Sequence, residues 1–266
     1  MVARQFRKPR RFKRKKSILR NRFFWLGILT TLIIGAIFYF LFFLETFQVK
    51  QTIITGENKV SKENIKLLTE KKLENRLLFF KTKSIFLINT TEIKSDILDS
   101  FPQIAEVIAR REIPDTIDIN VTERSGLAVW CKKENCFLVD NKGVIFEKAP
   151  PEETDLPKIV DEQDRNSFNL GEKIIEEGVL KSILDIKINN NSGINIENFV
   201  ILNSERLNIK IAEGWEIYFN LKEDISWQLT KLDLVLKEEI SPERKGDLEY
   251  IDLRFSRVYY KYRGGN

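Results

Sequence analysis

The feature that constrains this chain most is a run without charge, FFWLGILTTLIIGAIFYFLFFL, from Phe23 to Leu44. As an α-helix rising about 1.5 Å per residue, the run extends about 33 Å, which is enough to cross a bilayer core of about 30 Å. A secretory signal typically has an apolar stretch of about 7 to 15 residues and a small-residue cleavage site. This run is longer and continues into Glu45, Thr46 and Phe47. We therefore expect an uncleaved transmembrane helix.

Charge is distributed unevenly around this run. Residues 1–22 hold eleven Lys or Arg and no acidic residue, and +5 for the whole chain minus +11 leaves −6 for residues 23–266. A basic segment of this density binds nucleic acid or marks the cytoplasmic side of a membrane anchor. Because an apolar span follows at once, the positive-inside rule favours the second interpretation. We expect a basic cytoplasmic tail at 1–22, a transmembrane helix at 23–44, an extracytoplasmic part at 45–266 and no nucleic-acid partner.

Small residues recur on one face of the predicted span. Gly27, Thr31 and Gly35 are spaced by four residues, the small-xxx-small pattern that lets a second helix approach closely. Many apolar runs contain such a triple by chance, so the pattern indicates a candidate packing face and leaves self-association open.

The two cysteines, Cys131 and Cys136, flank KKEN in the stretch VWCKKENCFLV. Two apolar runs around a short polar turn predict a β-hairpin, which brings both sulfur atoms within bonding distance in an oxidising compartment. Two free buried thiols fit the pattern equally well. A zinc site needs four ligands, and the chain has no histidine and no third cysteine, so no metal is expected.

The segment after the span predicts a compact unit with the order strand, helix, helix, strand, strand. Apolar residues alternate in the expected strands and recur at helical spacing in the expected helices. Ser61 is a typical helix N-cap. The expected elements are a strand at 47–54, a helix after Ser61, a helix at 91–100, and strands at 104–111 and 117–123.

The remainder predicts a second α+β region. The proline- and acid-rich stretch KAPPEETDLPKI at 148–159 indicates a connector or an irregular crossing. Asp224 is the expected cap of an amphipathic helix, and an aromatic strand ends the chain. The expected elements are a helix at 173–187, strands at 196–203, 206–212 and 215–221, a helix at 224–239, and a final strand from 248 to about 262.

Several stretches carry a family resemblance. VKQTIITGENKVSKENI and FPQIAEVIARREIPDTIDINVTER look like a POTRA module, and its position directly after one membrane anchor resembles the FtsQ/DivIB family of bacterial cell-division proteins. LAVW, VDNKGVIF and YIDLRF, further along the chain, are similar to the family as well. The resemblance implies an α+β fold with a POTRA-like βααββ domain at 45–124 and a C-terminal β domain at 125–266 that contains an antiparallel-rich sheet.

Acidic residues are the remaining candidates for catalysis, because a chain without histidine cannot form histidine-dependent triads or HExxH metal sites. In REIPDTIDINVTER, the apolar residues alternate with polar ones, so we interpret Asp118 as the solvent side of a strand and Asp115 as a turn residue. The doublets Glu152/Glu153, Glu176/Glu177 and Glu238/Glu239 are adjacent in sequence, whereas a retaining glycosidase needs carboxylates about 5 Å apart across a cleft. A membrane-anchored enzyme that acts on peptidoglycan through a carboxylate pair is the alternative function.

The resemblance also implies a binding site. In the family, the C-terminal strand and the helix before it receive a slender coiled-coil protein of the FtsB or DivIC type. The matching positions here are Tyr250, Ile251, Asp252, Leu253, Arg254 and Phe255. Arg254 and Phe255 are the leading contacts, and Arg257 and Tyr259 are added on position and chemistry alone. The exposure of Phe255 is open, and a buried Phe255 would be a core residue instead of a contact.

These observations together predict a non-enzymatic protein of the bacterial cell membrane at the division septum. Its expected partners are FtsB/DivIC-like and FtsL-like membrane proteins, through which it is linked to septal synthases. No cofactor and no small-molecule substrate is expected.

Overall fold

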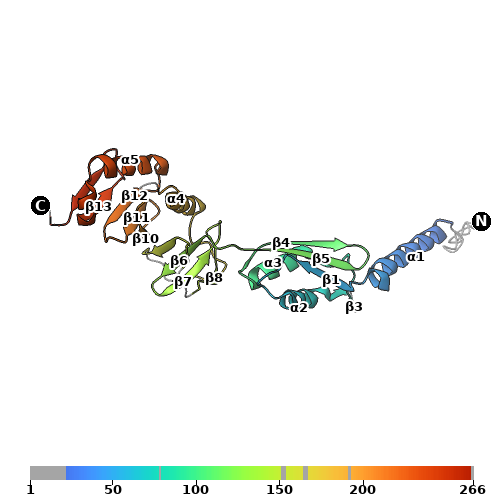
Figure 1. Cartoon of the computed structure of the whole chain (residues 1–266). Helices are drawn as coiled ribbons and strands as arrows, with labels where there is room; N and C mark the ends of the chain where they lie inside the picture. Colours follow the sequence, from blue (N-terminus) through green and yellow to red (C-terminus); the bar gives the residue numbers. More distant parts are fainter. Residues whose placement is uncertain (1–21, 78, 151–153, 164–166, 191–192, 265–266) are drawn as a thin grey trace, which may run out of the picture. The chain divides into compact units, whose positions relative to one another are not determined.

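The computed structural model describes residues 22–77, 79–150, 154–163, 167–190 and 193–264. It begins with helix α1, Arg22–Phe43, none of whose residues is buried (Figure 1). Within the described ranges, α1 is the single helix that is long and apolar enough to cross a bilayer. Apart from Arg22, the predicted basic tail lies outside the described residues, and so do Glu152 and Glu153.

Contact density divides the chain into two compact units. The described part of the first comprises residues 22–53, 70–89 and 110–118, and that of the second comprises 54–69, 90–109 and 119–264. The first unit joins α1 and the short 3₁₀ helix η2, Glu45–Phe47, to a hairpin that the sequence analysis did not predict. This hairpin consists of β2, Asn75–Leu77, and β3, Phe80–Thr82.

A three-stranded sheet in the order β1-β5-β4 follows α1 in the chain. The elements are β1, Gln51–Thr55; α2, Lys62–Leu73; α3, Thr90–Ser100; β4, Ile104–Glu112; and β5, Thr116–Glu123. Their order is the predicted one, although β1 begins four residues later than expected, after η2 and the connecting residues 48–50. Ile117, Ile119 and Val121 are buried along β5 while Asn120 and Thr122 are exposed, the period of two expected for a half-buried strand.

A nine-stranded sheet in the order β14-β13-β12-β11-β10-β9-β6-β7-β8 contains the rest of the strands. Three neighbouring pairs are parallel, namely β6 with β9, β9 with β10, and β12 with β13, and the other pairs are antiparallel. The strands are β6, Ala128–Lys132; β7, Asn135–Val139; β8, Ile145–Lys148; β9, Lys158–Asp161; β10, Ile196–Ile201; β11, Arg206–Ile211; β12, Glu216–Asn220; β13, Leu248–Asp252; and β14, Tyr259–Tyr262.

The helices α4, Glu177–Ile188, and α5, Ile225–Glu238, lie on one face of this sheet and share its hydrophobic core (Figure 1). Trp130 on β6 is completely buried there, and its ring packs edge to face on Phe168 at a centroid distance of 4.9 Å. Asp224 caps α5 as predicted, because its Oδ1 accepts a hydrogen bond of 3.0 Å from the backbone N–H of Trp227. The predicted mixed α+β fold is thus confirmed.

Three sequence predictions differ from the structure. The helix expected at 173–187 begins at Glu177, because the N–H groups of Ile174 and Ile175 both donate to Gly143 O, at 2.9 and 3.2 Å, and so hold these residues outside the helix. The connector at 148–159 ends in strand β9, which pairs on both sides. The single final strand is in fact two strands, β13 and β14, joined by a reversal.

Candidate protein-binding surface

The chain ends at one edge of the nine-stranded sheet. β13 is an inner strand, parallel to β12 on one side and antiparallel to β14 on the other. In the second pair Asp252 lies opposite Tyr259 and Ile251 lies opposite Tyr260. β14 is therefore the edge strand, and within the described residues no further strand pairs with its outer side.

The opposite edge of the sheet, β8, differs from β14. The segment 171–173 runs along β8, because Ile145 N donates to Glu172 O at 3.1 Å and Gly171 N donates to Ile145 O at 2.7 Å. Val144 and Lys173 also form an antiparallel bridge. Some of the backbone N–H and C=O groups on the outer side of β8 are thus already hydrogen-bonded to this segment. The outer backbone groups of β14 remain available to another strand.

A buried lysine holds the reversal between β13 and β14 in place. Lys231 lies on the inner side of α5 with 8% of its surface exposed. Its ammonium group donates to Leu253 O at 2.8 Å and to Phe255 O at 2.7 Å. Because a buried charge needs hydrogen-bond partners, the backbone of 253–255 and the helix fix each other.

Arg254 forms a bidentate ion pair with Asp252 on the face of the sheet opposite the helices. Its Nε and Nη2 donate to the Asp252 carboxylate at 2.8 and 2.6 Å. Burial by itself would raise the pKa of the Asp252 carboxyl, but the hydrogen bonds from the side chain and backbone of Arg254 outweigh it, so the pKa lies below its usual value. The side-chain hydrogen bonds to Asp252 in turn raise the pKa of Arg254. The guanidinium is thus directed at Asp252 and lies near the Tyr218 ring, 5.4 Å from its centroid.

Exposed aromatic and apolar side chains occur on α5, in the reversal and on β14. Phe255 is 52% exposed and its ring meets that of Tyr259 edge to face at 5.8 Å. Trp227 and Leu234 lie one turn before and after Lys231 on α5, and both are exposed. We call the set Trp227, Leu234, Phe255, Tyr259 and Tyr260 the terminal edge surface.

The residues that the sequence proposed as contacts differ in their exposure to solvent. Ile251, Asp252 and Leu253 are buried, Tyr250 and Arg254 are half-buried, and Phe255, Arg257 and Tyr259 are exposed. The side chains of Ile251 and Leu253 belong to the hydrophobic core, so they shape the sheet from within. Of the predicted contact residues, only Phe255, Arg257 and Tyr259 present mostly exposed side chains.

Sequence reasoning missed four members of this region. Lys231 lies within an otherwise apolar helix face, and nothing in its sequence distinguishes it from a solvated lysine. Trp227 carries a weak signal, because a tryptophan on the polar side of an amphipathic helix is unusual for a purely solvated face. Leu234 is exposed on the same helix and carries no distinguishing signal. Tyr260 was part of the predicted aromatic strand, and burial together with the Glu239 carboxylate at the end of α5 raises its pKa.

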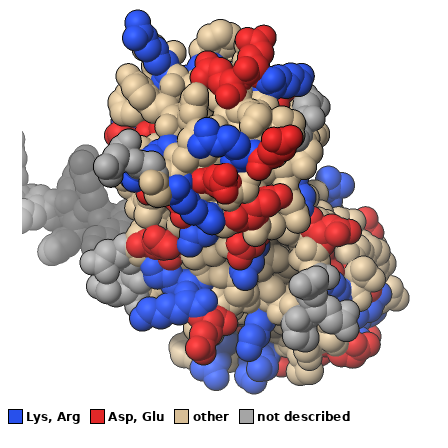
Figure 2. All heavy atoms as spheres, turned by 60° about the vertical axis from the view of Figure 1, so that its left-hand side comes forward, with Lys and Arg blue, Asp and Glu red and all other residues tan. Residues whose placement is uncertain are grey.

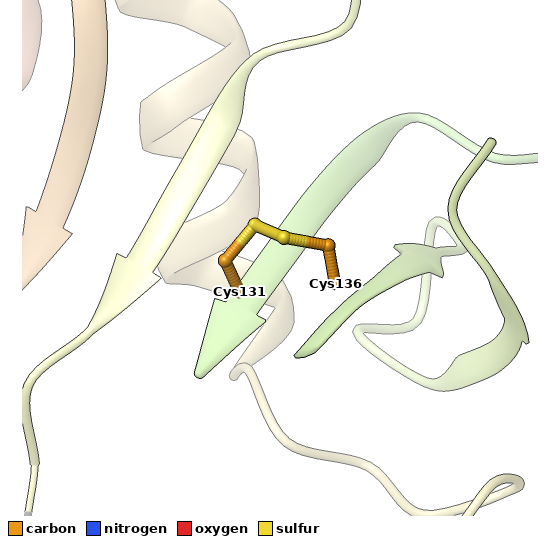
Figure 3. The surroundings of a disulfide bond; sticks show 2 residues. All are labelled: Cys131 and Cys136. Carbon is orange, nitrogen blue, oxygen red and sulfur yellow. A yellow bond between two sulfur atoms is a disulfide. The ribbon is translucent and has the colours of Figure 1, made fainter. Parts of the chain in front are cut away.

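The two other proposed residue groups lie elsewhere. Cys131 and Cys136 are directly opposite each other on β6 and β7 and are joined by a disulfide with an S–S distance of 2.11 Å (Figure 3). Gly27 and Gly35 have open space around their Cα atoms on α1, and the Thr31 hydroxyl donates to Gly27 O at 2.9 Å. Both groups are separate in sequence and in role from the terminal edge surface.

The acidic side chains that were candidates for catalysis form contacts that stabilise the structure. Glu123 accepts backbone hydrogen bonds of 2.8, 2.9 and 2.8 Å from Asn58, Lys59 and Val60. Burial would raise the pKa of the Glu123 carboxyl, but these donors outweigh it and lower the pKa. Glu176 and Glu177 are both exposed and pair with Lys173 at 3.3 and 3.6 Å. Among the described residues, no group of three or more Cys, Asp or Glu side chains is placed to hold a metal.

Charges of both signs are mixed on the face of the molecule that Figure 2 draws. Figure 2 shows Lys and Arg side chains interspersed with Asp and Glu side chains over the face in view. A mixed surface does not produce the extended positive potential that attracts nucleic acid. Exposed aromatic residues within a mixed-charge surface are instead typical of protein interfaces.

Comparisons with known proteins agree with this architecture. Residues 47–124 match the POTRA domain of FtsQ type, and residues 128–254 match the C-terminal region of cell division protein FtsQ/DivIB. Cell division protein DivIB of Clostridium tetani is 28% identical over 221 residues, which cover 79% of this chain and 77% of that protein.

Shorter alignments point the same way. DivIB of Clostridium acetobutylicum is 33% identical over 104 residues, covering 39% of this chain and 38% of that protein. Cell division protein FtsQ of Rickettsia bellii is 32% identical over 103 residues, covering 38% and 35% of the two chains. With both family models matched in order behind an apolar helix, the chain belongs to the FtsQ/DivIB family of cell division proteins.

Proposed function

We propose that this chain is a non-enzymatic assembly protein of the division septum. It crosses the cell membrane once through α1, with its basic tail in the cytoplasm and the remainder outside. There it binds a slender coiled-coil membrane protein of the FtsB/DivIC type, and with it an FtsL-like partner, and so positions septal synthases. Its action is binding and positioning.

The bare outer side of β14 is the observation that supports this proposal best. A partner segment in extended conformation can add a strand there, since main-chain hydrogen bonds supply affinity and side-chain pockets supply specificity. The terminal edge surface provides aromatic side chains for such pockets, and Arg257 is exposed beside it. Lys231 and the Asp252–Arg254 pair hold the backbone before β14 in a fixed path, which reduces the ordering that binding requires.

Calorimetric titration tests the proposal. The full chain in lipid nanodiscs would be titrated with the extracytoplasmic part of an FtsB/DivIC-like protein from the same cell. We expect saturable binding, and we expect Phe255→Ala to weaken it by at least tenfold, because an exposed aromatic anchor typically contributes 2 kcal/mol or more, about 30-fold, to an interface.

Ile188→Ala is the matched control, since Ile188 is an exposed apolar residue at the end of α4, 77% accessible. It should leave the affinity unchanged. Binding that is equally insensitive to both substitutions would place the interface away from β14, and no binding by the intact chain would remove the proposed partner. The alternative, a peptidoglycan-acting enzyme, requires released glycan fragments that disappear on a Glu→Gln substitution.

A further inference from the structure

The β2–β3 hairpin presents an apolar tip to its surroundings. Phe79 is a turn residue and Phe80 begins β3, and their side chains are 96% and 63% exposed. Two adjacent phenylalanine side chains that are this exposed are unfavourable in water and are typical of a binding or membrane-contacting site.

Side chains near the hairpin cap the end of α1. The last carbonyl groups of an α-helix lack partners within the helix. Here Thr82 Oγ1 donates to Phe42 O at 2.6 Å, Ser84 Oγ donates to Leu41 O at 3.0 Å, and Gln48 Nε2 donates to Phe42 O at 3.0 Å. The base of the hairpin is therefore fixed at the residues where the apolar helix ends.

Backbone and ring contacts extend this attachment. Lys83 O accepts from Val49 N at 3.0 Å, and Phe47 O accepts from Ile85 N at 2.9 Å. The ring of Phe80 meets that of Phe43, the last residue of α1, edge to face at 5.8 Å. Because Phe43 ends a helix whose length matches the bilayer core, Phe80 lies at the level of the lipid boundary when α1 spans the membrane.

Basic side chains flank the apolar tip. Arg76 on β2 lies directly opposite Lys81 on β3, a like-charged pair that destabilises an isolated hairpin. Both are exposed, as is Lys83, which directly follows β3. Lys81 has an exposed partner in Glu74 at 3.3 Å, which is worth little in water. Anionic groups at a membrane surface would relieve this repulsion.

We propose that the β2–β3 hairpin is a second membrane contact of this protein. Its tip enters the outer leaflet of the bilayer, and its basic side chains lie among anionic lipid headgroups. This proposal rests on the proposed function only in requiring that α1 spans the same bilayer. The contact would set the orientation of the extracytoplasmic part relative to the membrane plane. A single membrane-spanning helix permits rotation of this part about the helix axis, whereas a second contact through the hairpin tip restricts it.

Spin-label accessibility in nanodiscs of mixed anionic and neutral lipid tests this proposal on the full chain. Single nitroxide labels would be attached at Phe79→Cys, at Leu67→Cys and at Ile34→Cys, without reductant so that the native disulfide stays closed. Leu67 is an exposed apolar residue of α2, and Ile34 lies in the middle of α1. Wild-type chain treated with the same reagent reports any labelling of Cys131 or Cys136.

We expect the label at residue 79 to be accessible to oxygen and shielded from a water-soluble nickel complex, as at residue 34, while the label at residue 67 is accessible to nickel. Neutral lipid alone should increase nickel access at residue 79 and leave residue 34 unchanged. A nickel-accessible label at 79 with a shielded one at 34 would overturn the hairpin proposal alone. Shielding of residue 79 from both probes would indicate a protein contact and would overturn it as well. A nickel-accessible label at 34 would refute the membrane span itself.

Discussion

Replacing Lys231 by methionine should loosen the end of the chain. The substitution keeps most of the apolar stem but removes the ammonium group that donates to Leu253 O and Phe255 O. Hydrogen bonds to charged groups contribute about 1.5–3 kcal/mol each, and a buried carbonyl left without its donor costs about 1–3 kcal/mol. Relief from burying the lysine charge offsets part of this loss. We therefore expect the free energy of unfolding to fall by about 2–4 kcal/mol.

Urea denaturation followed by tryptophan fluorescence measures this change, since Trp130 and Trp215 are buried in the core of the nine-stranded sheet. Amide hydrogen exchange of residues 253–262 reports the local effect. Lys237→Met is the matched control, because Lys237 is exposed on the same helix and should change stability by less than about 0.5 kcal/mol. Equal stability and equal exchange protection in the Lys231 variant and the wild type would refute the assigned role.

Two further predictions concern the same sheet. Asp252→Asn should destabilise the fold at pH 7 by about 1–3 kcal/mol. The pKa of Asp252 is lowered in the folded state. The stabilisation from its ionised carboxylate is therefore complete above about pH 4 and is lost as the pH falls through the folded-state pKa. The stability difference between wild type and variant should therefore shrink in urea titrations toward pH 2, and a difference independent of pH would contradict the ion-pair explanation. Gly143→Ala should destabilise by more than 2 kcal/mol, because Gly143 has φ +79° and an added Cβ would lie 1.9 Å from Ile175 O. Gly178→Ala, on open helix surface, should instead raise the thermal midpoint slightly.

The terminal edge combines a rigid base with an accessible strand. The backbone before β14 is held from one face by Lys231 and from the other by the Arg254 ion pair. The side chains of Phe255 and Tyr259, which follow it, are exposed. A partner strand added to β14 would thus meet a surface whose position is already determined, which favours affinity because little further ordering is needed.

Local sequence patterns determined several features of this protein. An uninterrupted apolar run is sufficient to predict α1, because helix length and bilayer thickness are fixed distances. Alternation along β5 predicted which of its side chains are buried, and Asp224 predicted the start of α5. These predictions succeeded because each depends on residues that are neighbours in the chain and on the helix and strand periods of 3.6 and 2. The order of elements and the quoted motifs were also sufficient to identify the family.

Tertiary structure alone decided which parts of the final aromatic stretch are accessible. Packing in the core that the sheet shares with α4 and α5 buries Ile251 and Leu253, whereas Phe255, only two residues further on, is exposed. The hydrogen bonds from Lys231 join residues more than twenty positions apart, and the caps from Thr82 and Ser84 reach across forty. The β2–β3 hairpin depends on such distant partners too, since three-residue strands have too few local contacts to be stable alone. Sequence periodicity reports the face of one element, and only packing between elements determines which neighbour covers it.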